Sequence, residues 1–217
     1  MADTRKCEQC GTVFTPRREH VRFCSAGCRV AWVRAHRGDP AAQMSALGWS
    51  VTAMGESADR LSSVQTWDDM RAFGAVSEAV WWVTIVDATM VRFHADAYDE
   101  VLDGFIPAKR RLVEETLEGL RFVRNQVGAG GHVDFVRPGE GNGSHGGIAA
   151  WTWAPLPKPP LASLLPRGQA WEMSRYRAYQ ARLAGHTIGS TFSRVAAFLR
   201  LAAEKAACLG DTADVTP

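Results

Sequence analysis

Four cysteines in one short N-terminal segment limit most strongly what this chain of 217 residues can fold into. They are Cys7, Cys10, Cys24 and Cys28. The chain has five cysteines in all, an odd number that excludes a complete disulfide framework, and residues 1–6 are polar, unlike a secretory signal. We therefore expect a cytoplasmic protein, in which clustered thiols usually bind a metal ion.

The spacing of these cysteines, Cys-x2-Cys-x13-Cys-x3-Cys, suits a tetrahedral metal site. The first pair presents two thiolates from one turn, and Cys28 falls in the first turn of an expected helix that Cys24 precedes. A segment of about 32 residues buries no core of its own, so the metal would supply folding free energy on the order of 10 kcal/mol. Four sulfur ligands leave no open position, which predicts a structural site. Free thiols and an iron–sulfur cluster are the alternatives.

The residues around the cysteines add a family resemblance. Gly11 follows the first pair, Phe23 precedes the third cysteine and Ser25 follows it. In these features residues 5–37 resemble treble-clef zinc fingers of the FCS-like kind. The resemblance implies that all four cysteines bind one structural zinc ion (Zn2+), and that the finger binds either nucleic acid or protein.

The finger is basic. Residues 1–40 carry a formal net charge of +4, residues 41–135 of −6 and residues 136–217 of +4, within a total of +2. Arginine side chains can contact phosphates, and Trp32 can stack on a base or pack within the finger. The candidate nucleic-acid-binding residues are Arg17, Arg18, Arg22, Arg29, Trp32 and Arg34.

Beyond the finger the pattern predicts a mostly α fold, a helical bundle domain with one β-hairpin insertion. The expected organisation is a finger at residues 1–38, a linker or short helix at 39–66, a helical domain at 67–209 with a hairpin at about 132–154, and a disordered tail at 210–217. The hairpin is expected because two apolar runs flank a connector that contains five glycines.

Helical spacing suggests which side chains face the core. One stripe runs through Val80, Thr84, Asp87, Val91, His94 and Tyr98. A second helix begins at Pro107 and ends at Gly128, and two more occupy about 169–183 and 190–208. A buried arginine needs a carboxylate, so we expect Asp87 to pair with Arg124. Cys208 is expected to be a small buried side chain.

Trp151 and Trp153 alternate with smaller residues and therefore share one face of a strand. That face would either form an aromatic floor for a ligand or pack on a helix. Large tryptophans in the predicted helices, among them Trp81 and Trp171, are expected to be apolar anchors.

The end of the Pro107 helix carries a second resemblance. Arg124 and Asn125 are followed by a glycine-rich turn and His132, an arrangement similar to that of HEPN domains. These are helical bundles, often dimeric, many of which are metal-independent ribonucleases. The resemblance implies a catalytic set of Arg124, Asn125 and His132, in which the arginine stabilises phosphate charge and the histidine transfers a proton. It also implies a possible homodimer.

These patterns favour a cytoplasmic zinc protein that binds RNA or DNA through its basic finger and basic C-terminal helices and is not catalytic. The first alternative is a HEPN-like endoribonuclease of the toxin or defence type. The second is an adaptor that binds a protein partner through the finger and the Trp151/Trp153 face. No membrane association is expected, since the apolar runs are far shorter than the roughly 20 residues that cross a bilayer.

Overall fold

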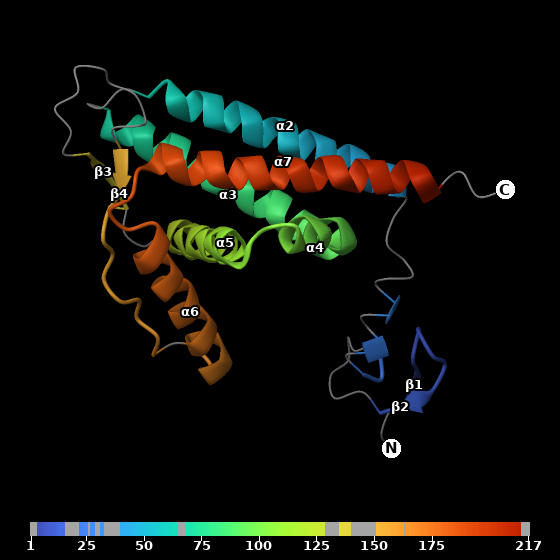
Figure 1. Ribbon diagram of the computed structural model, residues 1–217. Coiled ribbons are helices and arrows are strands. Elements are labelled where there is room, and N and C mark those ends of the chain that lie inside the picture. Colours follow the sequence, from blue (N-terminus) through green and yellow to red (C-terminus); the bar gives the residue numbers. More distant parts are fainter. Residues whose placement is uncertain are drawn as a thin grey trace. The chain divides into compact units, whose positions relative to one another are not determined.

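The computed structural model divides into two compact units, Met1–Met44 and Ser45–Pro217. It describes residues 4–15, 22–25, 27–28, 31–32, 40–64, 68–128, 135–139, 151–162 and 164–213. The second unit contains most of α2 (Pro40–Ser62) and all of α3 (Asp69–Phe93), α4 (Ala95–Asp103), α5 (Pro107–Gly128), α6 (Pro166–Arg182) and α7 (Ile188–Ala213). The hairpin of β3 (Val136–Pro138) and β4 (Trp151–Trp153) lies at one end (Figure 1). The prediction of a mostly α fold with one β-hairpin is confirmed.

The N-terminal unit contains a two-stranded antiparallel ribbon, β1 (Arg5–Lys6) and β2 (Val13–Phe14). Between the strands the chain makes a tight turn, in which the Gly11 N–H donates to the Cys7 carbonyl at 2.9 Å. Gly11 has a φ of +72°, in the left-handed region that a residue without Cβ adopts at little cost. The glycine after the first cysteine pair thus closes the turn that presents both thiols.

The stretch expected to be a linker or a short helix is instead the 23-residue helix α2 (Pro40–Ser62). Its buried side chains Leu47, Met54 and Leu61 are each 1% exposed and follow one another at intervals of seven residues. Residues seven apart lie two turns along the same helix face, so these three large side chains give α2 one continuous buried stripe. The exposed Trp49 and the small and polar residues between them hide this repeat in the sequence.

The stripe predicted across residues 80–98 is interrupted. Helix α3 (Asp69–Phe93) ends just before His94, and α4 (Ala95–Asp103) begins just after it. Thr84 and Asp87 are buried as expected, but Val91 is 48% exposed. The prediction for Val91 is wrong because the buried side of α3 at this end is the one that carries Met90, which is 0% exposed, and Val91 next to it lies at the surface.

The hairpin pairs β3 (Val136–Pro138) with β4 (Trp151–Trp153) in antiparallel register. Both tryptophans of β4 are buried, at 1% and 0% exposure, and Trp153 Nε1 donates to Thr191 Oγ1 of α7 at 3.0 Å. The face therefore packs on the helices. The alternative of an aromatic floor for a ligand is wrong, and so is the exposed Trp151/Trp153 face of the adaptor hypothesis.

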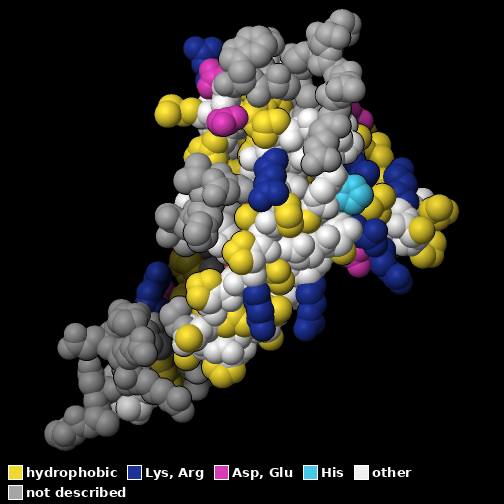
Figure 2. All heavy atoms as spheres, turned by 90° about the vertical axis from the view of Figure 1, so that its left-hand side faces the viewer, with side chains coloured by type: hydrophobic (Ala, Val, Ile, Leu, Met, Phe, Trp, Pro, Cys, Tyr) yellow, Lys and Arg dark blue, Asp and Glu magenta, His cyan; other side chains and the backbone are white. Residues whose placement is uncertain are grey.

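Helix α6 (Pro166–Arg182) packs along α5 (Pro107–Gly128) and is tied to the chain that leaves β4. Tyr176 Oη and Gln180 Nε2 both donate to the Leu156 carbonyl, at 3.1 and 2.8 Å, and the Tyr179 hydroxyl donates to the Ala154 carbonyl. The hairpin and α6 lie on the face that Figure 2 shows. These bonds fix the direction in which α6 leaves the bundle.

The last helix, α7 (Ile188–Ala213), is longer than expected. It includes residues 210–213 of the predicted tail, and residues 214–217 lie outside the described residues. Cys208 is exposed on α7, so its predicted burial is wrong. Trp81 and Trp171 are 55% and 58% exposed and are not buried anchors. Within the part of the chain that the structure describes, no helix has the length and apolarity to cross a membrane.

The α5–α6 contact yields a stability prediction at Gly119. A Cβ there would lie 3.2 Å from the Tyr179 Cα and 2.7 Å from the Leu183 Cδ1. We expect Gly119→Ala to lower the free energy of unfolding by about 1–3 kcal/mol, because overpacking outweighs the gain in helix propensity. Gly74→Ala in α3 is the control, since a Cβ there meets nothing within 4 Å, and it should stabilise by up to about 1 kcal/mol. Urea unfolding measures both, and equal stabilisation by the two variants would contradict the close packing.

Candidate metal centre

Local backbone structure brings the two cysteine pairs together. Cys7 follows β1, and Cys10 lies in the turn that Gly11 closes. The second pair is held by Ser25, whose Oγ accepts a hydrogen bond from the Cys28 N–H at 3.1 Å, the pattern of a helix N-cap. The serine after the third cysteine therefore orients the fourth.

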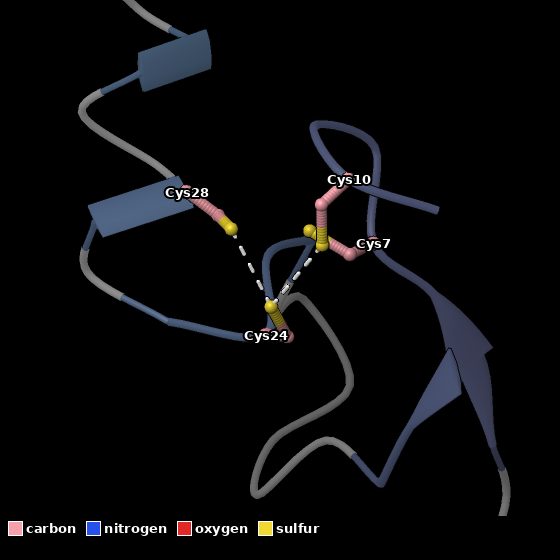
Figure 3. Close-up of side chains that lie close together, drawn as sticks. All are labelled: Cys7, Cys10, Cys24 and Cys28. Carbon is pink, nitrogen blue, oxygen red and sulfur yellow. Dashed lines mark hydrogen bonds between the residues drawn. The ribbon is translucent and has the colours of Figure 1, made fainter. Parts of the chain in front are cut away.

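The four sulfur atoms converge on one point (Figure 3). The Sγ atoms all lie within 4.8 Å of one another. The Cys24 Sγ lies 3.6 Å from the Cys10 Sγ and 3.5 Å from the Cys28 Sγ. Tetrahedral zinc, with bonds of about 2.3 Å, separates its sulfur ligands by about 3.8 Å. The cluster can hold a metal ion, and its donor set fits zinc.

The thiols differ in acidity without a metal. Burial disfavours the Cys7 thiolate, but hydrogen bonds from the backbone of Cys24, Cys10 and Gln9 outweigh it and lower the Cys7 pKa to about 6. The Thr12 hydroxyl, 3.3 Å from the Cys10 Sγ, lowers the Cys10 pKa. The neighbouring Cys28 and Cys10 sulfurs raise the Cys24 pKa to about 12. Closely spaced thiolates repel one another, and a bound divalent cation offsets that repulsion.

Two of the candidate nucleic-acid-binding residues contact each other inside the finger. The Arg22 Nε lies 2.6 Å from the Glu8 Oε1, and the Arg22 guanidinium carbon lies 4.8 Å from the centroid of the Trp32 ring. Trp32 also contacts Phe23, with ring centroids 5.6 Å apart. Of the two expectations for Trp32, the structure shows packing within the finger. The remaining candidates, Arg17, Arg18, Arg29 and Arg34, lie outside the described residues.

No protein-family model matches this chain, and neither a curated protein nor a solved structure is found to match it. The FCS-like and HEPN resemblances therefore rest on the residues alone.

The catalytic set stays a prediction, because His132 lies outside the described residues. Arg124 and Asn125 are partly buried near the end of α5. The Asn125 Nδ2 donates to Glu172 Oε2 at 3.2 Å, and Gln126 Nε2 donates to the other oxygen at 3.1 Å. In this structure Asn125 thus holds α6 against α5.

The buried carboxylate of Asp87 has a different partner from the one predicted. Its Oδ2 accepts from the Arg121 Nε at 2.9 Å, and its Oδ1 accepts from the Tyr98 hydroxyl at 2.9 Å. The expected Arg124 pairing is wrong by one helical turn, because the crossing of α3 and α5 places Arg121 opposite Asp87. The apolar surroundings and the Asp87 charge raise the pKa of Tyr98 above its usual range.

The Asp87 cluster extends to the surface through a chain of ion pairs. Arg121 also pairs with Glu118, whose other oxygen accepts from Arg175 of α6 at 3.1 Å. A cavity of about 410 Å³ beside Arg121 is lined by residues of α3, α4 and α5. The charged residues of its lining include Arg121, Glu118, Arg110 and Glu114. Helices α3, α5 and α6 are therefore joined through charged side chains that neutralise one another, and the Tyr98 hydroxyl ties α4 to the same group.

Removal of the metal should unfold the finger alone. We expect Cys10→Ser to lose the bound metal and Cys208→Ser, outside the cluster, to retain it, as measured by metal content after gel filtration. Because the helical unit is a separate compact unit, a chelator should leave its circular dichroism and thermal unfolding unchanged. Loss of metal from the Cys208 variant, or collapse of the helical signal on chelation, would contradict this assignment.

Asp87→Asn should destabilise the helical unit by about 3 kcal/mol, because the partly buried Arg121 loses its buried ion-pair partner and keeps only the more exposed Glu118. The control is Asp103→Asn, which breaks an ion pair with Arg110 whose side chains are 68% and 40% exposed. That change should cost less than about 1 kcal/mol. Equal losses in denaturant unfolding would show that burial adds nothing to the Asp87 pair.

Proposed function

We propose that this chain is a structural zinc-finger protein that binds nucleic acid. The observation that carries the proposal is the convergence of four cysteine sulfurs within 4.8 Å. The short sulfur–sulfur distances favour a single ion over an iron–sulfur cluster, since a cluster inserts several atoms between its cysteines. With four sulfur ligands the ion has no open position for substrate, which supports a structural role.

Charge supports nucleic acid as the ligand of the finger. Residues 1–40 carry a net charge of +4, which suits a phosphate backbone. We assign phosphate contacts to Arg17, Arg18, Arg29 and Arg34. Arg22 is bound to Glu8 and covers Trp32, so its role is to hold the finger in shape.

The binding test compares arginine variants of the full-length, zinc-loaded protein. Affinity for short RNA and DNA fragments, measured by fluorescence anisotropy, should fall steeply between about 50 and 200 mM salt. Arg17→Gln with Arg18→Gln should flatten the salt dependence, by about 0.7–0.9 in log–log slope for each lost phosphate contact.

The matched control is Arg22→Gln, which should leave the salt slope unchanged and lower the thermal stability of the finger. Metal content is measured for each variant to show that the finger is loaded. Absence of salt-dependent affinity for either nucleic acid in the loaded wild type would overturn the proposal, and a purified complex with a protein partner but no nucleic acid would favour the adaptor.

A further inference from the structure

A second basic region lies far from the finger in sequence. Residues 151–203 contain seven lysines and arginines and a single acidic residue, Glu172. Such an imbalance gives a positive surface unless acidic residues from elsewhere in the fold neutralise it.

Helix α5 neutralises only the inward side of α6. The Arg175 Nε lies 3.1 Å from Glu118 Oε2, and the Arg182 Nε lies 2.5 Å from Glu115 Oε2. Glu172 also points to α5, where it accepts hydrogen bonds from two side-chain amides. The single acidic residue of α6 therefore lies at the α5 contact, and the outward side of α6 carries no acidic side chain.

The outward side of α6 carries cations around an exposed aromatic ring. Arg167, Ser174 and Arg177 are exposed there, and Trp171 is 58% exposed. The Arg167 guanidinium lies 5.1 Å from the centroid of the Trp171 ring. Helical rise separates Arg167 from Arg177 by about 15 Å, with Trp171 between them along the axis.

The surface around α6 has the same character. Figure 2 shows Lys and Arg side chains predominating over Asp and Glu on the face where α6 and the hairpin lie. Lys158, before α6, and Arg137, on β3, are both exposed. Positive charge is therefore spread over the face and is not confined to one helix.

We propose that the outward face of α6, defined by Arg167, Trp171 and Arg177, binds single-stranded nucleic acid. Trp171 stacks on one unpaired base while the two arginines contact the flanking phosphates. A single strand is required because the bases of a duplex are covered by their neighbours and offer no free face to the ring. This inference rests on the proposed nucleic-acid binding and adds a second, separate contact surface to it.

The test measures binding of a short fluorescein-labelled oligouridylate and of its duplex to the full, zinc-loaded chain. Trp171→Ala should weaken binding to the single strand by about 5- to 150-fold, the contribution of one stacked base. Trp81→Ala is the matched control, since that ring is 55% exposed on α3, and it should change affinity less than twofold. Arg167→Gln with Arg177→Gln should flatten the salt slope by about 0.7 per lost contact.

Three other results would each overturn the inference. Equal affinity of the Trp171 and Trp81 variants, with binding still weakened by Arg17→Gln and Arg18→Gln, removes the α6 surface and leaves the finger as the binding site. No binding of either oligonucleotide by the wild type removes both proposals. Unchanged oligonucleotide binding together with loss of binding to phosphatidylglycerol vesicles in the Trp171 variant assigns the face to anionic lipid.

Discussion

The close contact between α5 and α6 depends on a missing side chain at Gly119. Because nothing larger than hydrogen stands there, the backbone of Tyr179 comes within 3.2 Å of where a Cβ would lie. At this separation Glu115 and Glu118 form ion pairs with two arginines of α6, Arg182 and Arg175. The side-chain amides of Asn125 and Gln126 also reach Glu172. The acidic residues near α6 therefore lie at its contact with α5, and Arg167 and Arg177 stay exposed on the outward side.

The finger follows a different physical rule. Its described side chains are mostly exposed, so burial contributes little to its folding. Instead of a core, the finger brings four cysteine sulfurs together. The turn closed by Gly11 presents the first cysteine pair, and the Ser25 cap orients the second. A metal ion bound at this point would replace the missing core. With a metal bound, the two units would gain stability from separate sources, the ion in the finger and side-chain burial in the helical unit.

Burial of one carboxylate organises the helices between these regions. Asp87 is 1% exposed, and a charge so placed is costly unless donors surround it. Tyr98 of α4 and Arg121 of α5 both donate to it. The carboxylate thereby fixes the position of α4 directly after the break at His94, and ties three helices at one point.

Local signals in the sequence were sufficient for several elements. Pro107 and Gly128 mark the ends of α5, glycines and alternating apolar residues mark the hairpin, and the cysteine spacing marks the metal cluster. In each case the signal lies within the same short segment of chain as the structure that it produces. The full length of helix α2 was not predicted, because its three large buried residues lie seven apart among mostly small and polar neighbours.

The tertiary structure alone decided which partners meet. Arg121 and Arg124 are one turn apart on the same helix, so periodicity could not choose between them, and the crossing of α3 over α5 selected Arg121. Trp153 is buried and Trp171 is exposed although both are equally apolar, because Trp153 packs against α7 whereas the fold leaves Trp171 58% exposed on α6. The sequence by itself determined the cysteine cluster and the two ends of α5, since local spacing encodes them. Ion-pair partners and the outward face of α6 depend on helix packing, which no local spacing encodes.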